Sequence, residues 1–596
     1  MTTPPTSPLY LGLDLSTQQL KGEKAIPIPS LAAIIVNSDL ETIAQAKVDF
    51  DQDLGSRYGI RAGVIVQADE VFAPVAMWLE ALDLVLTRLH DDDDDDDAIL
   101  RRVRAVSGAG QQHGSVFWNS DAEKLLASLD GRSTLLHQLP AALAHPWSPN
   151  WQDQSTQTEC DALDVAFGDR QRLAEVTGSG AHHRFTGAQI MRLRRLLPDM
   201  FAASSRISLV SSWLASVLRG AIAPLDMADV CGMNLWDMTN QRYSEKLLAL
   251  VAGGREAAEQ LRRKLGEPLP DGGLSLGPIS PYFVARYGFS PDCQIVPFTG
   301  DNPATMLALP LRPLDAIVSL GTSTTFLMNT PVYEADESYH FFHHPTTPGH
   351  YMFMLCYKNG GLAREKVRDD LTPGQEGDPW HTFNKAVLET PPLHLPDDED
   401  DDARAKLGLY FLLRETVPNL AAGTWRFTCR ANGTDLQPTS SSSSPPPPPP
   451  WPRTTDARTI VESQALSMRL RSRRLVRSPG QGLPPQPRRI YLVGGGAANP
   501  ALARVLGDVL GGSEGVYRLL DVGGGNACAL GGAYKALWAS ERGHGQTFDD
   551  LVAARWTEKS AVVKVDDGYR PGIYEKYGRV LAAFEEMEGR LLAEEA

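Results

Sequence analysis

Three apolar runs of this chain end directly in turns of small and hydroxyl residues. The runs are residues 10–15 (YLGLDL), 315–320 (DAIVSL) and 490–493 (IYLV), and the turns that follow them are STQQ, GTST and GGGAAN. Short apolar runs bounded by such turns are typical of buried strands. A fourth strand is predicted at 33–36, and helical periodicity is found at 71–89, 207–219, 501–510 and 527–538. This alternation predicts an α/β fold.

The three turns also have the chemistry of phosphate binding. Asp14 stands near the end of the first run, where a carboxylate can hold hydrated Mg²⁺. Hydroxyl groups and backbone N–H groups of the first two turns can bind phosphate oxygens. In the third turn, a backbone without side chains can approach a nucleotide closely. Three such turns in one chain favour a nucleotide held between two α/β domains.

Each turn alone is more often only a turn, and two other nucleotide motifs are not matched. The third turn resembles the dinucleotide fingerprint GxGxxG, but Asn499 stands where the last glycine is required. The chain also has no GxxxxGK[ST] sequence, which excludes a P-loop.

A second group of residues has the chemistry of a sugar or polyol pocket. Each sugar hydroxyl needs hydrogen-bond partners to replace water, so such pockets contain several fixed donors and acceptors. For His113 and Trp151 a purely structural role is an equally good interpretation, and Asp301 can instead be a helix N-cap. The segments concerned are GQQHG (110–114), WSPNWQD (147–153), RFTG (184–187) and GDNPA (300–304).

The net charge of −16 comes mainly from two acidic runs, 91–97 and 397–402, which together contribute 13 negative charges. Such runs are typical of solvated loops, and the serine- and proline-rich segment 439–452 is expected to be another inserted loop. The chain lacks the clustered Lys and Arg of a nucleic-acid surface and has no apolar run long enough to span a membrane. Six scattered cysteines and no visible secretory signal predict a cytoplasmic protein.

Many segments, in the same order, resemble the FGGY family of carbohydrate kinases, and within it the eukaryotic members that act on D-xylulose. The resemblance covers about residues 9–540 apart from the low-complexity loops. The matching segments are DLSTQQLK (14–21), SGAGQQHGSVFW (107–118), NWQDQST (150–156), RFTGAQI (184–190), RISLVSSW (206–213), DMADVCGMNLWD (226–237), FTGDNPA (298–304), SLGTSTT (319–325), CYKNGGLAREK (356–366), GGGAANPAL (494–502) and GNACALGGAYKA (525–536).

The resemblance implies two actin-like (ribonuclease H-like) α/β domains with the active site in a central cleft. We expect a sugar-binding domain over 1–299 and a nucleotide-binding domain over 300–570, the latter with a low-complexity insert at about 430–455. The implied catalytic base is Asp301. The implied sugar ligands are Gln112, His113, Arg184, Asp301 and Asn302. The implied ATP and phosphate ligands are Asp14, Thr17, Gly321, Thr322, Trp380, Gly495, Gly496 and Asn499, with Asp14 also near Mg²⁺ through water.

The expected activity is ATP-dependent phosphorylation of D-xylulose to D-xylulose 5-phosphate, with ATP and Mg²⁺ and without a macromolecular partner. A kinase for another pentulose or polyol, or a catalytically inactive sugar sensor, remains an alternative. A nicotinamide-dependent dehydrogenase is disfavoured by the missing glycine at position 499. The sequence leaves open whether the protein is a monomer or a homodimer.

Two segments depart from the family pattern. Residues 22–32 (GEKAIPIPSLA) separate the first turn from the next strand. Because proline cannot donate to a strand ladder, Pro27 and Pro29 are not expected in a central strand pair, and the segment is expected to loop out of a hairpin tip or to be a translated intron. The stretch 430–489 contains a predicted helix at 456–473 and a basic patch at 469–477, which is expected to be a solvated helix face.

Overall fold

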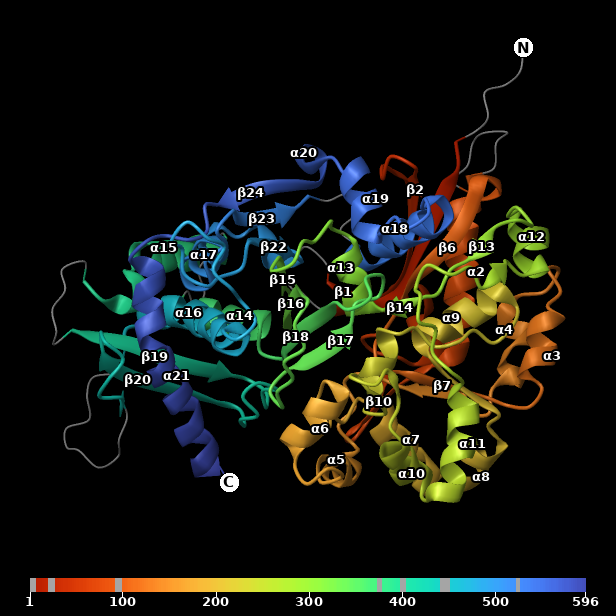
Figure 1. Cartoon of the computed structure of the whole chain (residues 1–596), viewed down its shortest axis with the longest axis horizontal. Helices are drawn as coiled ribbons and strands as arrows, with labels where there is room; N and C mark the ends of the chain where they lie inside the picture. Colours follow the sequence, from red (N-terminus) through yellow and green to blue (C-terminus); the bar gives the residue numbers. More distant parts are fainter. Residues whose placement is uncertain are drawn as a thin grey trace, which may run out of the picture.

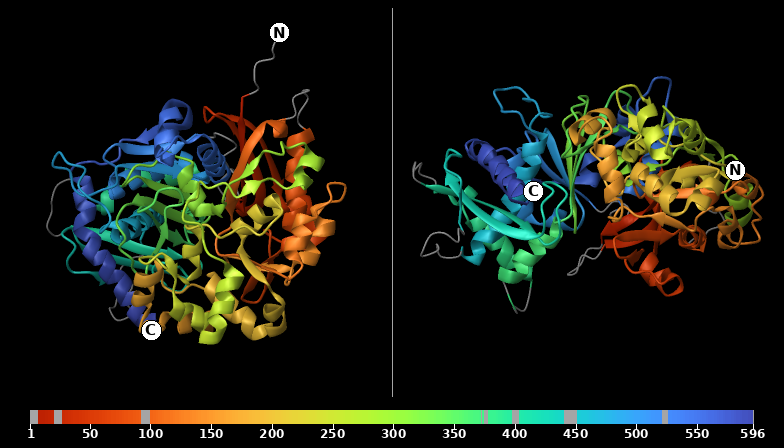
Figure 2. Two further views of the ribbon diagram at one scale, coloured as in Figure 1. Left: turned by 45° about the vertical axis from the view of Figure 1, so that its right-hand side comes forward. Right: turned by 90° about the horizontal axis from the view of Figure 1, so that it is seen from below.

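A computed structural model describes residues 7–19, 27–91, 99–371, 373, 378–396, 403–439, 451–520 and 526–595. Most of the aspartate run, the second acidic run, the serine- and proline-rich run from residue 440 and the first part of the 22–32 segment lie outside the described residues. In the described part, two seven-stranded sheets form the centres of two lobes (Figure 1). Seen from below, the lobe that contains helix α21 (Ile573–Glu595) and the lobe that contains the N-terminal strands lie on opposite sides (Figure 2).

The first sheet is built around strand β1 (Leu9–Gln19). It pairs in parallel with β6 (Val103–Gly110) and antiparallel with β2 (Pro27–Asn37), which in turn pairs with β3 (Thr42–Asp49). The sheet is completed beside β6 by the short strands β12 (Gly277–Pro278), β13 (Gln294–Ile295) and β14 (Thr299–Gly300).

The second sheet repeats this plan around β15 (Ala316–Leu320). It pairs in parallel with β22 (Arg489–Val493) and antiparallel with β16 (Thr324–Thr330). Both sheets therefore place one antiparallel and one parallel neighbour around the same kind of strand. The remaining strands are β17 (His340–His343), β18 (Tyr351–Tyr357), β23 (Gly515–Leu519) and β24 (Val562–Asp566).

Helix α18 (Ala527–Glu541) comes from the end of the chain but packs on β1 and β6 of the first sheet. The contact requires residues without side chains on both partners. A Cβ on Gly12 would lie 1.8 Å from the Ala529 carbonyl oxygen, and a Cβ on Gly532 would lie 2.7 Å from the Gly108 Cα. The chain therefore crosses between the two sheets a second time. The single domain boundary expected near residue 300 remains a prediction.

The expectation that the 22–32 segment loops out was wrong for residues 27–32, which belong to β2, although neither Pro27 nor Pro29 lies in a central strand pair. Both lie in β2, opposite Gln19 and Thr17 of β1. On the other side of β2, pairing with β3 begins only at Ser30. The prolines therefore lie where the ladder has one neighbour, and their missing N–H groups remove no bond from a second strand. The hairpin itself agrees with the expectation, and its tip at 20–26 lies outside the described residues.

The predicted helices are present with small shifts of their ends. The helix expected at 71–89 begins later, because Glu70–Pro74 form strand β5 before α2 (Val75–Asp91), and residues 206–209 form strand β9 before α9 (Val210–Arg219). The other bounds are α13 (Asp301–Leu307), α14 (Gly361–Leu371), α15 (Pro379–Glu389), α16 (Arg453–Ser472), α17 (Pro500–Leu510) and α19 (Phe548–Arg555).

The basic patch at the end of α16 was expected to be a solvated helix face. This expectation holds for only part of the patch. Arg471 is buried and pairs with Glu588 of α21. The Arg469 guanidinium lies 3.5 Å from the ring centre of Tyr574, also in α21. Arg473 pairs with Glu585 at the surface. The arginines at the end of α16 therefore contact acidic and aromatic side chains of α21. The spacing of the arginines in the sequence does not reveal these partners.

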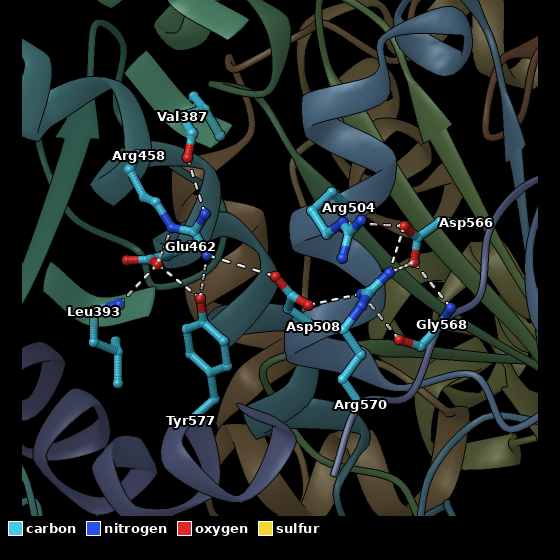
Figure 3. A network of polar contacts seen from close by, with 10 residues as sticks. All are labelled: Val387, Leu393, Arg458, Glu462, Arg504, Asp508, Asp566, Gly568, Arg570 and Tyr577. Atoms are coloured by element: carbon cyan, nitrogen blue, oxygen red, sulfur yellow. Dashed lines mark hydrogen bonds and ion pairs between the residues drawn. The ribbon is translucent and has the colours of Figure 1, made fainter. Parts of the chain in front are cut away.

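A second set of charges joins α16 to α17 and α21 in the interior of the second lobe (Figure 3). Arg458 donates to Glu462 at 2.7 Å and lies 3.6 Å from Asp508 of α17, which pairs with Arg570 at 2.7 Å. Tyr577 of α21 donates to Glu462 at 2.7 Å. These residues hold three helices together behind the second sheet.

Candidate active site

A cavity of about 470 Å³ lies between the two sheets and is lined by residues from both. Ser16, Gln112, His113, Arg184, Asp301 and Asn302 come from the segments around the first sheet. Thr322, Ser323, Lys358, Val493 and Gly494 come from the segments around the second sheet. Six of the predicted site residues thus line one cavity, although they are up to 210 positions apart in the sequence.

Asp301 is the carboxylate at the floor of this cavity. It begins α13 directly after β14, and its Oδ1 accepts hydrogen bonds from the Asn302 backbone N–H at 2.8 Å and the Asn302 Nδ2 at 3.0 Å. The N-cap of α13 is Gly300, so the N-cap interpretation of Asp301 does not hold. Burial, strengthened by the nearby Asp14 carboxylate, raises the pKa of Asp301 to about 7. A carboxylate with this pKa can accept a proton near neutral pH.

Asn302 and Gln112 form a polar bridge next to Asp301. Asn302 Nδ2 donates to Gln112 Oε1 at 2.7 Å. Behind this bridge the backbone of Gly300 is tightly enclosed, because a Cβ there would lie 2.5 Å from Gln112 Cγ and 2.7 Å from Asp229 Oδ1. Glycine before Asp301 therefore lets the carboxylate and the two amides occupy the same small region.

His113 presents one ring nitrogen to the cavity as an acceptor. Its Nδ1 lies 3.0 Å from the Gly232 carbonyl oxygen, so Nδ1 must carry the proton and Nε2 is left with a lone pair. The ring stacks on Phe185 with 4.5 Å between centroids. Burial and the neighbouring Arg184 guanidinium hold the pKa of His113 well below its usual range. The imidazole is therefore neutral at physiological pH.

Arg184 is a buried cation in the same wall. Its Nη2 donates to His340 Nε2 at 3.1 Å, and the other ring nitrogen of His340 donates to Ser179 Oγ at 2.9 Å. His340 lies on β17 at the edge of the second sheet. Burial and Arg184 hold the pKa of His340 well below its usual range, so this ring is also neutral. Arg184 is thus fixed by a residue of the opposite sheet.

Asp14 lies within β1, opposite Ala32 on one side and Ala109 on the other, and is fully buried. Its Oδ2 accepts a hydrogen bond from Ser16 Oγ at 2.9 Å. Thr17 is placed in β1 opposite Pro29, and its side chain lies outside the described residues.

The residues around Asp14 fit a magnesium ion held through water and phosphate. Among the residues that the structure describes, no group of three or more His, Cys, Asp or Glu side chains is placed to hold a metal ion directly. However, Asp14 raises the pKa of Asp301, which shows that two carboxylates lie within electrostatic range of each other beside the cavity. Mg²⁺ typically keeps several waters and takes one or two carboxylates together with substrate phosphates.

The GTST turn after β15 is held against the start of α14. Gly361 donates its N–H to the Gly321 carbonyl at 2.8 Å, and the Leu362 N–H reaches the Thr322 carbonyl at 3.2 Å. A Cβ on Gly361 would lie 2.2 Å from the Gly321 oxygen, so only glycine allows this approach. Thr322 faces the cavity from this turn.

The predicted adenine-side residues lie beyond the cavity wall formed by Val493 and Gly494. Gly495 and Gly496 belong to a short 3₁₀ turn, and Asn499 caps α17 by accepting from the Ala501 and Leu502 N–H groups. Asn499 Nδ2 also donates to Asn384 Oδ1 at 2.8 Å, and Asn384 lies on α15, one turn after Trp380. These four residues thus gather around α15 and α17 rather than on the wall of the cavity itself.

Lys358, which follows β18 within the CYKNGG segment, lines the cavity but was given no role from the sequence. Ser323, a hydroxyl residue of the predicted GTST turn, lines the cavity as that prediction implied. His340 supports Arg184 from a strand that has no local sign of a site. The family-like segment containing Lys358 was a usable signal, whereas the partnership of His340 and Arg184 depends on tertiary structure.

Two family models together match more than half of this chain. The model described as the FGGY family of carbohydrate kinases, N-terminal domain, matches residues 149–308, and the corresponding C-terminal domain matches residues 316–540. The chain belongs to the FGGY family of carbohydrate kinases. It is therefore a carbohydrate kinase, which excludes the interpretation as a dehydrogenase.

Curated relatives are similar over the whole chain. A probable D-xylulose kinase A of Neosartorya fischeri is 55% identical over 595 residues, covering 99% of each chain. D-xylulose kinase A of Aspergillus niger is 55% identical over 594 residues with the same coverage. Both relatives thus match this chain at 55% identity along nearly its full length.

Solved structures share the fold at low identity. A xylulose kinase from Rhodospirillum rubrum superposes with a TM-score of 0.71 at 17% identity, covering 98% of this chain and 99% of the other. Plasmodium falciparum glycerol kinase with ADP gives a TM-score of 0.66 at 11% identity, with 98% of each chain covered. The two-domain, actin-like α/β fold is therefore confirmed. No helix among the described residues has the length and apolar character needed to cross a membrane.

Proposed function

We propose that this kinase transfers the terminal phosphoryl group of ATP to the C5 hydroxyl of D-xylulose, giving D-xylulose 5-phosphate and ADP. The observation that carries the proposal is Asp301, whose pKa of about 7 suits a general base, at the floor of a cavity lined by both sheets. The choice of D-xylulose is supported by the two fungal relatives named above, which are 55% identical over the whole chain.

In the proposed reaction, Asp301 accepts the proton of the C5 hydroxyl as that oxygen attacks the phosphoryl group. A positioned base of this kind contributes ~10²–10⁴-fold to the rate. The amides of Gln112 and Asn302 fix the sugar next to the base. His113 Nε2 accepts a hydrogen bond from a second hydroxyl, and Arg184 donates to a third oxygen. Because phosphoryl transfer depends mainly on alignment and charge neutralisation, no covalent enzyme intermediate is needed.

On the nucleotide side, we assign the phosphates to Thr17 near the end of β1 and to Gly321 and Thr322 in the turn after β15. Gly495, Gly496 and Asn499 bind the rest of the nucleotide, and Trp380 flanks the adenine. Asp14 is the residue that would hold Mg²⁺ through water, and bound Mg²⁺ neutralises charge on the transferring phosphates. The lobes enclose the reacting groups, so water is kept from competing with the sugar as acceptor.

We further propose that the protein acts in the cytoplasm as a monomer or homodimer, with a sugar-binding domain over 1–299 and a nucleotide-binding domain over 300–570. The cytoplasmic assignment is supported by the six cysteines, all of which carry free thiols in the structure. The substrates are the sugar and ATP, and no nucleic acid or membrane takes part.

A coupled assay of ADP release tests the proposed substrate. We expect D-xylulose to give the highest kcat/KM in a panel with D-ribulose, L-xylulose, glycerol and D-arabinitol. ADP release with glycerol or another member of the panel, but not with D-xylulose, would contradict the assignment and favour a different pentulose or polyol kinase. ADP release with none of them would favour a sugar sensor that keeps the fold.

A further inference from the structure

Lys358 is a cation that lines the cavity. Neither the family-like segments nor the reaction proposed above gives this residue a role. It follows β18 of the second sheet, and its half-buried side chain lines the cavity together with Arg184 and Asp301. Among the residues that the structure describes, no acidic side chain forms an ion pair with Lys358. Burial lowers the pKa of Lys358 and the Arg184 guanidinium lowers it further, while the Glu415 carboxylate opposes the shift, so Lys358 and Arg184 lie within electrostatic range of each other.

The backbone that carries Lys358 is rigidly fixed. Glu415 accepts from the Lys358 N–H at 2.7 Å and from the Asn359 N–H at 2.9 Å. The Asn359 side chain in turn accepts from the Leu412 and Leu413 N–H groups. A long side chain that starts from a fixed point and lacks an ionic partner is prepared for a ligand rather than for a structural contact.

The same loop is joined to the second phosphate turn. Gly361 and Leu362 donate to the carbonyls of Gly321 and Thr322, and a Cβ on Gly360 would lie 2.2 Å from Thr324 Oγ1. The chain from Lys358 to Leu362 therefore contacts the cavity at one end and the turn assigned to phosphate at the other. A ligand held by Lys358 is linked to the position of that turn through two backbone hydrogen bonds.

We propose that the Lys358 ammonium donates to oxygens of the bound sugar from the side opposite Arg184, so that both sheets hold the sugar and sugar binding strengthens nucleotide binding. A ketose presents hydroxyl and carbonyl oxygens along its whole length, and these accept from an ammonium without competing for the proton that Asp301 removes. The inference deepens the proposed function and rests on it.

Lys358→Met removes the charge at nearly constant length. We expect the KM for D-xylulose to rise between about 10-fold and 100-fold, which corresponds to the loss of one hydrogen bond to a charged group. Lys358→Arg should recover part of this loss. Lys366→Met is the matched control, because Lys366 lies on α14 shortly after the same loop, is half exposed and pairs with Asp370 at the surface. The control should keep the wild-type KM and kcat.

The second readout is the coupling between sugar and nucleotide. Dissociation constants of a non-hydrolysable ATP analogue are measured by calorimetry with and without D-xylulose. In the wild type, the sugar should tighten nucleotide binding, and Lys358→Met should abolish this gain while leaving affinity without sugar unchanged, which a general folding defect would not do. An unchanged KM for the sugar, or a fall in kcat alone, would overturn the inference. A wild type that does not phosphorylate D-xylulose would instead refute the proposed function.

Discussion

The cavity and the charge network behind the second sheet use the same kinds of side chains in opposite ways. In the network of Figure 3, Arg458, Glu462, Asp508 and Arg570 each lie within 3.6 Å of an oppositely charged partner. In the cavity, Arg184, Lys358 and Asp301 line one space, and none of them forms an ion pair among the described residues. Buried charges are costly unless paired, so charges left without ionic partners indicate where ligands bind.

The comparison also shows what each region contributes. The network joins α16, α17 and α21, and its removal should affect stability. The cavity carries a carboxylate with a raised pKa and two neighbouring cations, and changes there should affect the reaction. Perturbed carboxylates in clefts are common at catalytic sites, although structural networks also shift pKa values. Mutations in the two regions therefore distinguish these roles.

The largest effect is expected from Asp301→Asn, which keeps the size of the side chain and removes the base. We predict a fall in kcat of ~10²–10⁴-fold with D-xylulose, because the proton of the attacking hydroxyl loses its acceptor. The melting temperature should stay close to that of the wild type. Asn302→Ala serves as a comparison, since it removes a neighbouring amide without removing the base. Near-normal turnover of Asp301→Asn would remove Asp301 from the role of base.

The opposite pattern is expected from Arg458→Met in the network. Removing one partner leaves Glu462 buried without its arginine, which should lower the free energy of unfolding by ~3–5 kcal/mol. At a temperature where the variant is folded, kcat should remain within about twofold of wild type. Arg473→Met is the control, because its pair with Glu585 is exposed and should contribute only ~0–1 kcal/mol. Equal destabilisation by the two variants would contradict the distinction between buried and exposed pairs.

A smaller, graded effect is expected from pH. Asp301 acts as a base only when ionised, and its pKa is raised to about 7 by burial and by Asp14. The kcat/KM for D-xylulose should therefore fall as pH decreases through about 7, approaching tenfold per pH unit on the acid side. The residual activity of Asp301→Asn should lack this limb. A profile that stays flat between pH 5 and pH 8 would show that no group in the cavity titrates as proposed.

The smallest effect is expected from deleting residues 91–97. This run supplies seven negative charges, belongs to none of the family-like segments and lies almost wholly outside the described residues. Charge runs of this kind are usually solvated, so turnover should stay within about twofold of wild type. A large loss of turnover, measured at matched ionic strength, would show that unpaired charge outside the cavity also takes part in function.

The sequence predicted the strands that carry the site from the small and hydroxyl residues that follow their apolar runs, although the first of these predicted turns, STQQ, is the end of β1 itself. β15 and β22 begin within a residue of the expected position, and Gln112, His113, Arg184, Asp301, Asn302 and Thr322 all line the cavity. Roles carried over from the family stay predictions until tested, including those of Trp380, Gly495, Gly496 and Asn499, which lie away from the cavity wall.

What the sequence did not predict depends on contacts between distant segments. Pro29 is tolerated in β2 because the pairing between β2 and β3 stops at Ser30. The residues of β2 do not predict the length of β3. Arg471 is buried because Glu588 lies opposite it, 117 positions along the chain. Lys358 belongs to a family-like segment, yet its place in one cavity with Arg184 depends on how the two sheets meet.

The most direct test of the central claim is to identify the product made from D-xylulose and ATP by the wild type and by Asp301→Asn. The reaction is followed by ³¹P NMR, and the phosphorylated position is assigned from carbon–phosphorus couplings. We predict that the wild type forms D-xylulose 5-phosphate and ADP in equal amounts and that Asp301→Asn forms neither at a comparable rate. Phosphate on a carbon other than C5, or equal product formation by the variant, would contradict the account.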